Sequence, residues 1–269
     1  MNGNLNAIWI LLLISVIISC GGGDGTGNIP GGGGDTPGEF IVDQSGEGDY
    51  TDIQSAVNDA EPGDVILVKN GTYRGRLVIN VSGTSSNPIT IMNYPDHSPV
   101  IIPGENDIDR VEFNAEHIIF EGFEVRGGWD GIKLYEGNNT VRNCYIHNNI
   151  TQGILIVSAS GITIEGNTIE SNGSGDGDCV IDGEYSPKHC HGIYISDYDC
   201  TGLEDILIRN NHIIGHPGRG IQWNGAGCDS KMRNTIVEGN LIENNSWGLA
   251  LFYNVEGAVI SDNVFISNS

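Results

Sequence analysis

A six-residue pattern that recurs along the chain constrains the fold more than any other feature of this sequence. A shorter pattern that begins with Gly follows each of its first five copies, and the period of the repeat is about 22 residues. One interval is longer, which an insertion of about sixteen residues before Gly192 explains. The six-residue copies read FEGFEV from Phe120, VRNCYI from Val141, IEGNTI from Ile164, IRNNHI from Ile208, VEGNLI from Val237 and ISDNVF from Ile260. The shorter copies read GIKLY from Gly131, GILIV from Gly153, GIYIS from Gly192, GIQWN from Gly220 and GLALF from Gly248.

This repeat predicts an all-β solenoid. Two or three short strands per period, separated by Gly and Asn corners, are typical of a chain whose equivalent strands stack in parallel sheets. Because side chains alternate along a strand, the shorter pattern places two apolar columns in the core. The first column is Ile132, Ile154, Ile193, Ile221 and Leu249, and the second is Leu134, Ile156, Ile195, Trp223 and Leu251.

Two further columns are made mostly of Asn. Stacked amides can hydrogen-bond along the axis of a solenoid and satisfy the polar groups of its turns. The sequence therefore predicts a structural role for both. One is Cys144, Asn167, Asn211, Asn240 and Asn263, and the other is Asn149, Asn172, His216, Asn245 and Asn268.

The N-terminal part of the repeat resembles a known superfamily. The segments DYTDIQSAV from Asp49, PGDVILV from Pro62 and GTY from Gly71 are similar to the N-terminal cap of pectate-lyase-like proteins. The resemblance covers residues 40–269 and implies a right-handed, single-stranded parallel β-helix over residues 39–269 with a short capping helix. No cap follows the last strand pattern, so we expect a chain that continues beyond Ser269.

The first forty residues predict export. Residues 7–19 form an apolar run too short to cross a bilayer, and Ile17-Ile18-Ser19-Cys20 resembles a bacterial lipobox. This implies a signal peptide over residues 1–19, lipidation of Cys20 and attachment to the bacterial outer membrane or cell surface. An uncleaved helix is the alternative. Ten of the eighteen residues 21–38 are Gly, which indicates a tether over residues 20–38.

The net charge of −23 limits the partners. It opposes binding to nucleic acid and to anionic membranes, so we expect membrane contact only through the lipid anchor. We expect a monomer that binds a polysaccharide.

The cysteines predict two disulfides. Cys200 and Cys228 each lie eight residues after the Gly of a successive coil, and adjacent strands are about 4.8 Å apart, within disulfide range. Cys179 and Cys190 bracket the insertion and could close it as a loop, while Cys144 remains a buried thiol. A metal cluster is the alternative, but the cysteines lack the spacing of one.

Function is expected on an outer face, where the insertion walls a groove. Cations, a His and aromatic residues share that face, although any exposed sheet face carries polar residues and a plain solvated surface is the alternative. The candidate catalytic residues are His191, Tyr194, Arg219 and Lys188. The candidate substrate-binding residues are Lys133, Gln222, Trp247, Tyr135 and Asn224.

These residue types favour β-elimination from a uronic-acid polymer. That reaction needs a cation for the substrate carboxylate, a base for the C5 proton and an acid for the leaving oxygen. Arg219 or Ca²⁺ could neutralise the carboxylate, His191 or Lys188 could be the base, and Tyr194 the acid. Calcium bound by carboxylates would reconcile the acidic chain with an acidic substrate. Its candidate ligands are Asp178, Asp182 and Asp197.

Two other functions remain open. GDCV from Gly177, HGI from His191 and RGI from Arg219 are faintly similar to polygalacturonase motifs, which implies a glycoside hydrolase with two carboxylates. A surface β-helix that binds glycans or mediates adhesion without catalysis is the third hypothesis.

Overall fold

The computed structural model describes residues 37–104, 111–173, 180–181, 184–185, 190–225, 228–252 and 254–268, which belong to one compact unit, Thr36–Ser269. The predicted signal peptide, Cys20 and residues 20–36 of the predicted tether lie outside the described residues. No helix in the described part of the chain has the length and apolar character to span a membrane.

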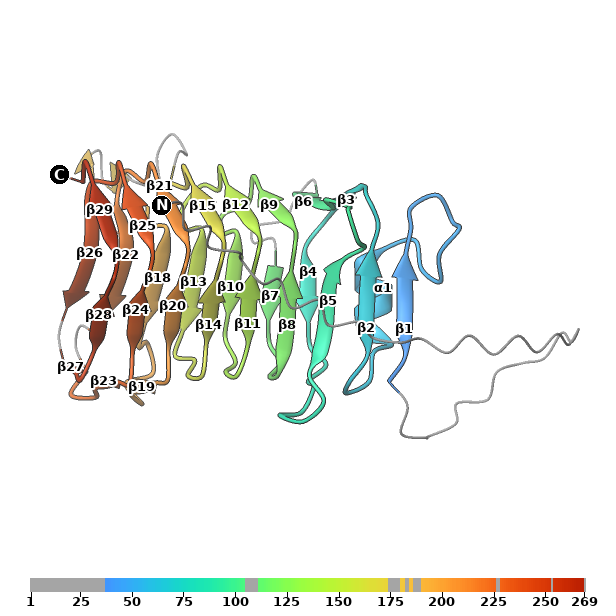
Figure 1. Cartoon of the computed structure of the whole chain (residues 1–269), viewed down its shortest axis with the longest axis horizontal. Helices are drawn as coiled ribbons and strands as arrows, with labels where there is room; N and C mark the ends of the chain where they lie inside the picture. The colour runs from blue at the N-terminus through green and yellow to red at the C-terminus, as the bar shows by residue number, and fades with distance from the viewer. Residues whose placement is uncertain are drawn as a thin grey trace, which may run out of the picture. The chain divides into compact units, whose positions relative to one another are not determined.

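Three parallel sheets, here called A, B and C, wind along this unit, and each coil contributes successive strands to them (Figure 1). Sheet A contains β1 (Glu39–Val42), β2 (Val65–Val68), β5 (Ile89–Asn93), β8 (Ile118–Glu121), β11 (Thr140–Arg142), β14 (Thr163–Glu165), β20 (Leu207–Arg209), β24 (Ile236–Glu238) and β28 (Val259–Ser261). Sheet B contains β3 (Thr72–Arg74), β6 (Val100–Ile102), β9 (Glu124–Arg126), β12 (Tyr145–His147), β15 (Thr168–Glu170), β21 (His212–Ile214), β25 (Leu241–Glu243) and β29 (Val264–Ile266). Sheet C contains β4 (Leu77–Ile79), β7 (Val111–Phe113), β10 (Ile132–Leu134), β13 (Ile154–Val157), β18 (Ile193–Ser196), β22 (Arg219–Asn224) and β26 (Trp247–Phe252).

Two smaller groups of strands complete the described structure. A short parallel row joins β19 (Leu203–Glu204), β23 (Met232–Arg233) and β27 (Val255–Glu256). An antiparallel pair, β16 (Val180–Ile181) and β17 (Glu184–Tyr185), lies within the predicted insertion. The prediction of a parallel β-helix solenoid is confirmed.

Each six-residue pattern is bent at its centre and divides into two strands instead of forming one. Its first two residues pair in sheet A and its last two in sheet B. The third residue has a positive φ in every copy, which only Gly, Asn and Asp adopt readily. These corner residues are Gly122, Asn143, Gly166, Asn210, Gly239 and Asp262.

The predicted core and cap are both present. Side chains of the two predicted apolar columns are buried, with Trp223 the largest, except that Leu249 and Leu251 in the last coils are only partly covered. The predicted capping helix is α1 (Ile53–Asn58), whose buried face packs on the first coils. The carboxylate of Asp52 caps it by accepting the backbone N–H of Ser55.

Both predicted Asn columns form continuous hydrogen-bonded ladders. Asn211 illustrates the pattern, because its Oδ1 accepts the backbone N–H of Asn167 at 2.9 Å and its Nδ2 donates to the carbonyl of Ile164 at 2.9 Å. All of these groups are buried. The ladder therefore satisfies backbone groups at the corners between sheets A and B.

Replacing Asn211 with Ala is expected to lower the free energy of unfolding by about 2 kcal/mol, because buried N–H and C=O groups would lose their partners. Urea denaturation of the two proteins measures the difference. Asn58→Ala, on the exposed side of α1, is the matched control and should change stability little. An equal effect of both substitutions would contradict the structural role of the ladder.

The cysteines follow the prediction where they are described. Cys200 and Cys228 form a disulfide with a Cα–Cα distance of 5.0 Å. Cys190 is also disulfide-bonded, and its predicted partner Cys179 lies outside the described residues. Cys144 is a free, buried thiol, and burial raises its pKa to about 12.

A row of alternating charges crosses the outer face of sheet A. In-register pairing places residues of opposite sign on neighbouring strands. Two of the contacts are short, from Arg142 to Glu121 at 2.7 Å and from Arg209 to Glu165 at 3.0 Å. The row, named here the sheet A charge row, consists of Glu121, Arg142, Glu165, Arg209 and Glu238.

Candidate functional site

The candidate site lies on the outer face of sheet C, over the neighbouring strands β18, β22 and β26 (Figure 1). Parallel pairing in register places Tyr194 beside Gln222, and Arg219 beside Trp247. Asn224 lies between Ser196 and Phe252 in the same way. The winding of the chain thus brings side chains from three different coils, between Tyr194 and Phe252 in the sequence, onto one face.

Arg219 is the central cation of this cluster. Its guanidinium lies between two aromatic rings, 4.7 Å from the centre of Trp247 and 4.9 Å from that of Phe252. Its Nη1 donates a hydrogen bond to Oε1 of Gln222 at 2.6 Å. Both rings and the amide are neutral, so the positive charge is held in place without being neutralised.

Two observations show that Arg219 is poorly compensated. Its Nε is buried without a hydrogen-bond partner. Among the residues that the structure describes, no carboxylate oxygen lies within 4.0 Å of its nitrogens. Burial lowers the pKa of the guanidinium from its ordinary value. A desolvated cation of this kind favours an anionic ligand, above all a planar carboxylate that can bind two N–H groups.

Tyr194 supplies a hydroxyl beside Arg219. Its oxygen accepts a hydrogen bond from Nδ2 of Asn224 at 3.0 Å. The side chain is half-buried, and this hydrogen bond fixes the orientation of the hydroxyl. This arrangement can hold a proton donor or acceptor next to a bound carboxylate.

His191 differs from its predicted position at the surface, because its side chain is fully buried. Nδ1 accepts the backbone N–H of Arg219 at 3.0 Å, and the ring lies edge-on to Tyr194 with centroids 5.3 Å apart. A nitrogen that accepts a backbone N–H carries no proton, so the imidazole is the neutral tautomer with hydrogen on Nε2. In this geometry no ring nitrogen presents a lone pair to a substrate on the outer face.

Lys133 lies in β10 and Tyr135 directly after it, two strands along sheet C from β18. The ammonium of Lys133 is 3.9 Å from the carboxylate of Asp130 and 5.3 Å from the centre of the Tyr135 ring. Since its charge is shared with a carboxylate, Lys133 is a weaker anion site than Arg219. Tyr135, 40% exposed, remains available for contact with a ligand.

An acidic hollow of about 360 Å³ lies beside Tyr135. Four carboxylates line it, which disfavours an anionic ligand at this place. They are Glu116, Glu136, Glu204 and Asp205. An acidic chain on sheet C would therefore lie over the strands and not in the hollow.

Of the three predicted calcium ligands, the structure describes only Asp197. Asp178 and Asp182 lie outside the described residues, as does the candidate base Lys188. Asp197 is buried and accepts the backbone N–H groups of Thr201 and Gly202 and the hydroxyl of Ser230, so its oxygens organise the loop at the Cys200–Cys228 disulfide. The described residues contain no group of three or more His, Cys, Asp or Glu side chains that could hold a metal ion.

Two contributors received no role from the sequence. The ring of Phe252 lies on one side of the Arg219 guanidinium. Gln152, in the preceding coil, accepts the backbone N–H of His191 at 2.8 Å. Each was identifiable by its position, because Phe252 follows Asn224 in its column and Gln152 precedes Gly153 as His191 precedes Gly192.

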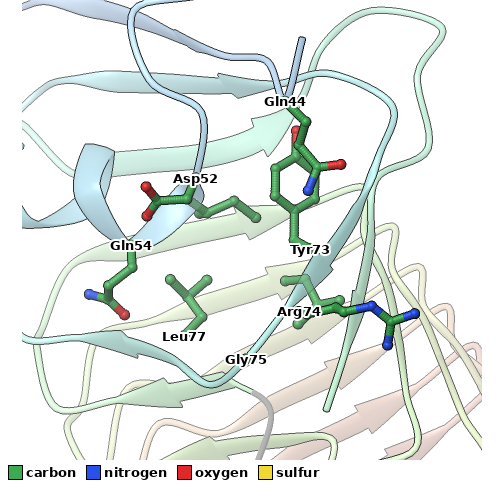
Figure 2. A pocket seen from close by; sticks show the side chains of 9 residues that line it. Gln44, Asp52, Gln54, Tyr73, Arg74, Gly75 and Leu77 are labelled. Carbon is green, nitrogen blue, oxygen red and sulfur yellow. The ribbon is translucent and has the colours of Figure 1, made fainter. Parts of the chain in front are cut away.

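A second pocket, of about 130 Å³, lies beside the start of α1, and Figure 2 shows its lining. Two of its polar side chains form hydrogen bonds with backbone groups of the first coils. The amide of Gln54 donates to the carbonyl of Val78 and accepts its N–H, each at 2.8 Å, and the hydroxyl of Tyr73 donates to the carbonyl of Lys69 at 3.0 Å. These hydrogen bonds give the pocket a structural role, which is to hold the capping helix against the first coils.

Comparisons with known proteins concern the whole solenoid. Residues 42–178 match the family described as the Pel9A-like right-handed β-helix region, and residues 111–269 match the right-handed β-helix region. Among curated proteins there is no significant match.

Several solved structures are similar to this chain at low sequence identity, and the two with TM-scores above 0.5 share its fold. An alginate lyase from Paenibacillus sp. str. FPU-7 is 15% identical with a TM-score of 0.54, covering 80% of this chain and 96% of the lyase. ORF18 of Geobacillus virus E2 is 17% identical with a TM-score of 0.53, covering 71% of this chain and 38% of that protein. The pectate lyase Pel9A is 16% identical with a TM-score of 0.49, covering 87% and 78%.

Proposed function

Because this chain belongs to the pectate-lyase-like superfamily of right-handed β-helices, we propose that it is a polysaccharide lyase that cleaves a uronic-acid polymer by β-elimination. The observation that carries the proposal is the uncompensated Arg219 guanidinium on a protein of net charge −23. A partly buried cation with no carboxylate partner among the described residues is stabilised when a ligand supplies the anion. A solved structure that shares this fold, and of which 96% is covered, bears the name alginate lyase.

The cluster provides groups for the steps of elimination. Arg219 would pair with the uronate carboxylate and stabilise the negative charge that it gains as the C5 proton leaves. The electron pair of the C5–H bond forms the C4=C5 double bond, the C4–O bond breaks, and the hydroxyl of Tyr194 gives its proton to the leaving oxygen. Lys188 is our candidate for the base. Trp247, 50% exposed, would stack on a sugar ring, while Gln222 and Asn224 hold Arg219 and Tyr194 in position.

The cellular location and oligomeric state that we propose rest on the sequence. We propose that the domain is a monomer attached through a lipid on Cys20 to the bacterial outer membrane, where an external polysaccharide is accessible. We further propose that Ca²⁺ takes part in binding, because a divalent cation lowers the repulsion between an acidic chain and an acidic polymer.

The test is a continuous ultraviolet assay for unsaturated products. The domain without Cys20 and its tether is mixed with a panel of uronic-acid polymers, with Ca²⁺ or with a chelator. Rising absorbance is the expected result, and chelation should reduce the rate. New reducing ends without absorbance would instead identify a hydrolase, and binding without either product would identify a glycan-binding protein.

A further inference from the structure

We propose that His191 is a positioning residue which fixes both Arg219 and Tyr194, and not the base that removes the proton. The inference rests on the proposed function, since it assigns a role within that site. It begins from the burial of the imidazole in a site whose other members reach the outer face. A residue covered on all sides can act on a substrate only through its neighbours.

An axial column of hydrogen bonds passes through His191. The backbone N–H of Gln152 donates to the carboxylate of Asp130 at 3.1 Å, and the backbone N–H of His191 donates to Oε1 of Gln152 at 2.8 Å. The backbone N–H of Arg219 then donates to Nδ1 of His191 at 3.0 Å. Each member occupies the position before the Gly of its coil, so the column ties the start of β22 to three preceding coils.

The imidazole contacts the two reactive groups in different ways. Through Nδ1 it fixes the backbone from which the Arg219 side chain extends towards Trp247 and Phe252. Through its ring edge it packs on Tyr194. A shift of this one ring would therefore move the cation and the hydroxyl relative to each other, which catalysis tolerates poorly.

The protein itself shows which residue can replace His in such a column. In the ladder of Asn149, Asn172, His216, Asn245 and Asn268, Nδ1 of His216 accepts the backbone N–H of Asn172 at 3.2 Å. Oδ1 of Asn245 accepts the corresponding N–H of His216 at 3.0 Å. Asn Oδ1 and His Nδ1 are thus equivalent acceptors in this solenoid. His191→Asn keeps the acceptor and loses the ring, whereas His191→Phe keeps a ring and loses the acceptor.

The experiment compares kcat/KM, its pH profile and the affinity for a uronic-acid trimer in the wild-type protein and the two variants. His191→Asn should keep the affinity within about threefold and the activity within about tenfold, because the backbone of Arg219 stays bound and only the ring contact with Tyr194 is lost. Phe should lower kcat/KM by about 10²-fold, because the cation is displaced. Both variants should keep the pH profile of the wild-type protein, and thermal unfolding confirms that each is folded.

The alternatives give different results. If His191 were the base, both variants would lose about 10² to 10⁴-fold in activity and the acidic limb of the profile would disappear, which would overturn the proposal. Equal, full activity of both variants would also overturn it. If the wild-type protein shows no elimination, the proposed function fails. The trimer affinities then decide: weaker binding by the Phe variant alone supports a positioning role, and equal or absent binding in all three proteins overturns it.

Discussion

Replacing Arg219 with Ala should lower kcat/KM for a uronic-acid polymer by about 10³-fold, because one preorganised charge is removed from the place where negative charge develops. The side chain makes no ion pair among the described residues, and its contacts with Gln222, Trp247 and Phe252 lie on the outer face, so the solenoid should remain folded. Initial rates in the ultraviolet assay, together with circular dichroism, measure both quantities.

Two further substitutions sharpen this prediction. Arg219→Lys keeps a charge but loses the planar group that stacks between the rings, so we expect an intermediate rate. Arg209→Ala removes the same kind of side chain from the sheet A charge row and should leave the rate unchanged. Unaltered turnover in Arg219→Ala would show that the carboxylate of the substrate binds elsewhere.

Acidification should destabilise the protein through His216. This residue is fully buried in the second Asn ladder, where Nδ1 accepts the N–H of Asn172 and Nε2 donates to the carbonyl of Ile169 at 3.1 Å. Burial lowers its pKa from 6.5 to about 4, and the hydrogen-bonding contacts with the backbone of Asn172 and Ile169 oppose this shift only in part. As the pH falls from 6.5 towards 4, the unfolded chain binds a proton that the folded chain does not. The free energy of unfolding should therefore decrease across this window by about 3 kcal/mol.

His216→Asn is the matched variant, because it restores the residue found elsewhere in the ladder and removes the titrating group. Urea unfolding of both proteins between pH 7 and pH 4 isolates the effect of His216 from that of the carboxylates, which titrate in both. The variant should show the shallower dependence on pH. Parallel curves for the two proteins would mean that His216 is protonated equally in the folded and unfolded states.

The solenoid could be predicted from the sequence because the interactions that stabilise it repeat at a constant interval along the chain. Apolar residues at a constant interval define the core, and Asn at a constant interval defines the ladders, so Trp223 and Asn211 could be placed from spacing alone. The bend at residues such as Asn143 was missed. Its signal, an alternation of Gly, Asn and Asp at one position, was present in the six-residue pattern.

The candidate site was harder to predict because the burial of its side chains does not follow the repeat. The column of residues before each Gly contains both the buried His191 and the exposed Trp247, and nothing in the spacing separates them. Whether a side chain lies inside or outside depends on the corner that precedes each strand. Lys188, Asp178 and Asp182 lie in the insertion, where the repeat gives no register, and their roles remain predictions.

The sheet A charge row bears on how the chain finds its correct partner strands during folding. Because the coils resemble one another, a strand could pair with the coil after next and leave one coil looped out. Such an error would place Arg142 against Arg209 and Glu121 against Glu165, and like charges directly opposite each other oppose pairing. Pairing with the adjacent coil brings opposite charges together. An alternation with a period of two coils therefore penalises the omission of a single coil, which uniform apolar columns could not detect.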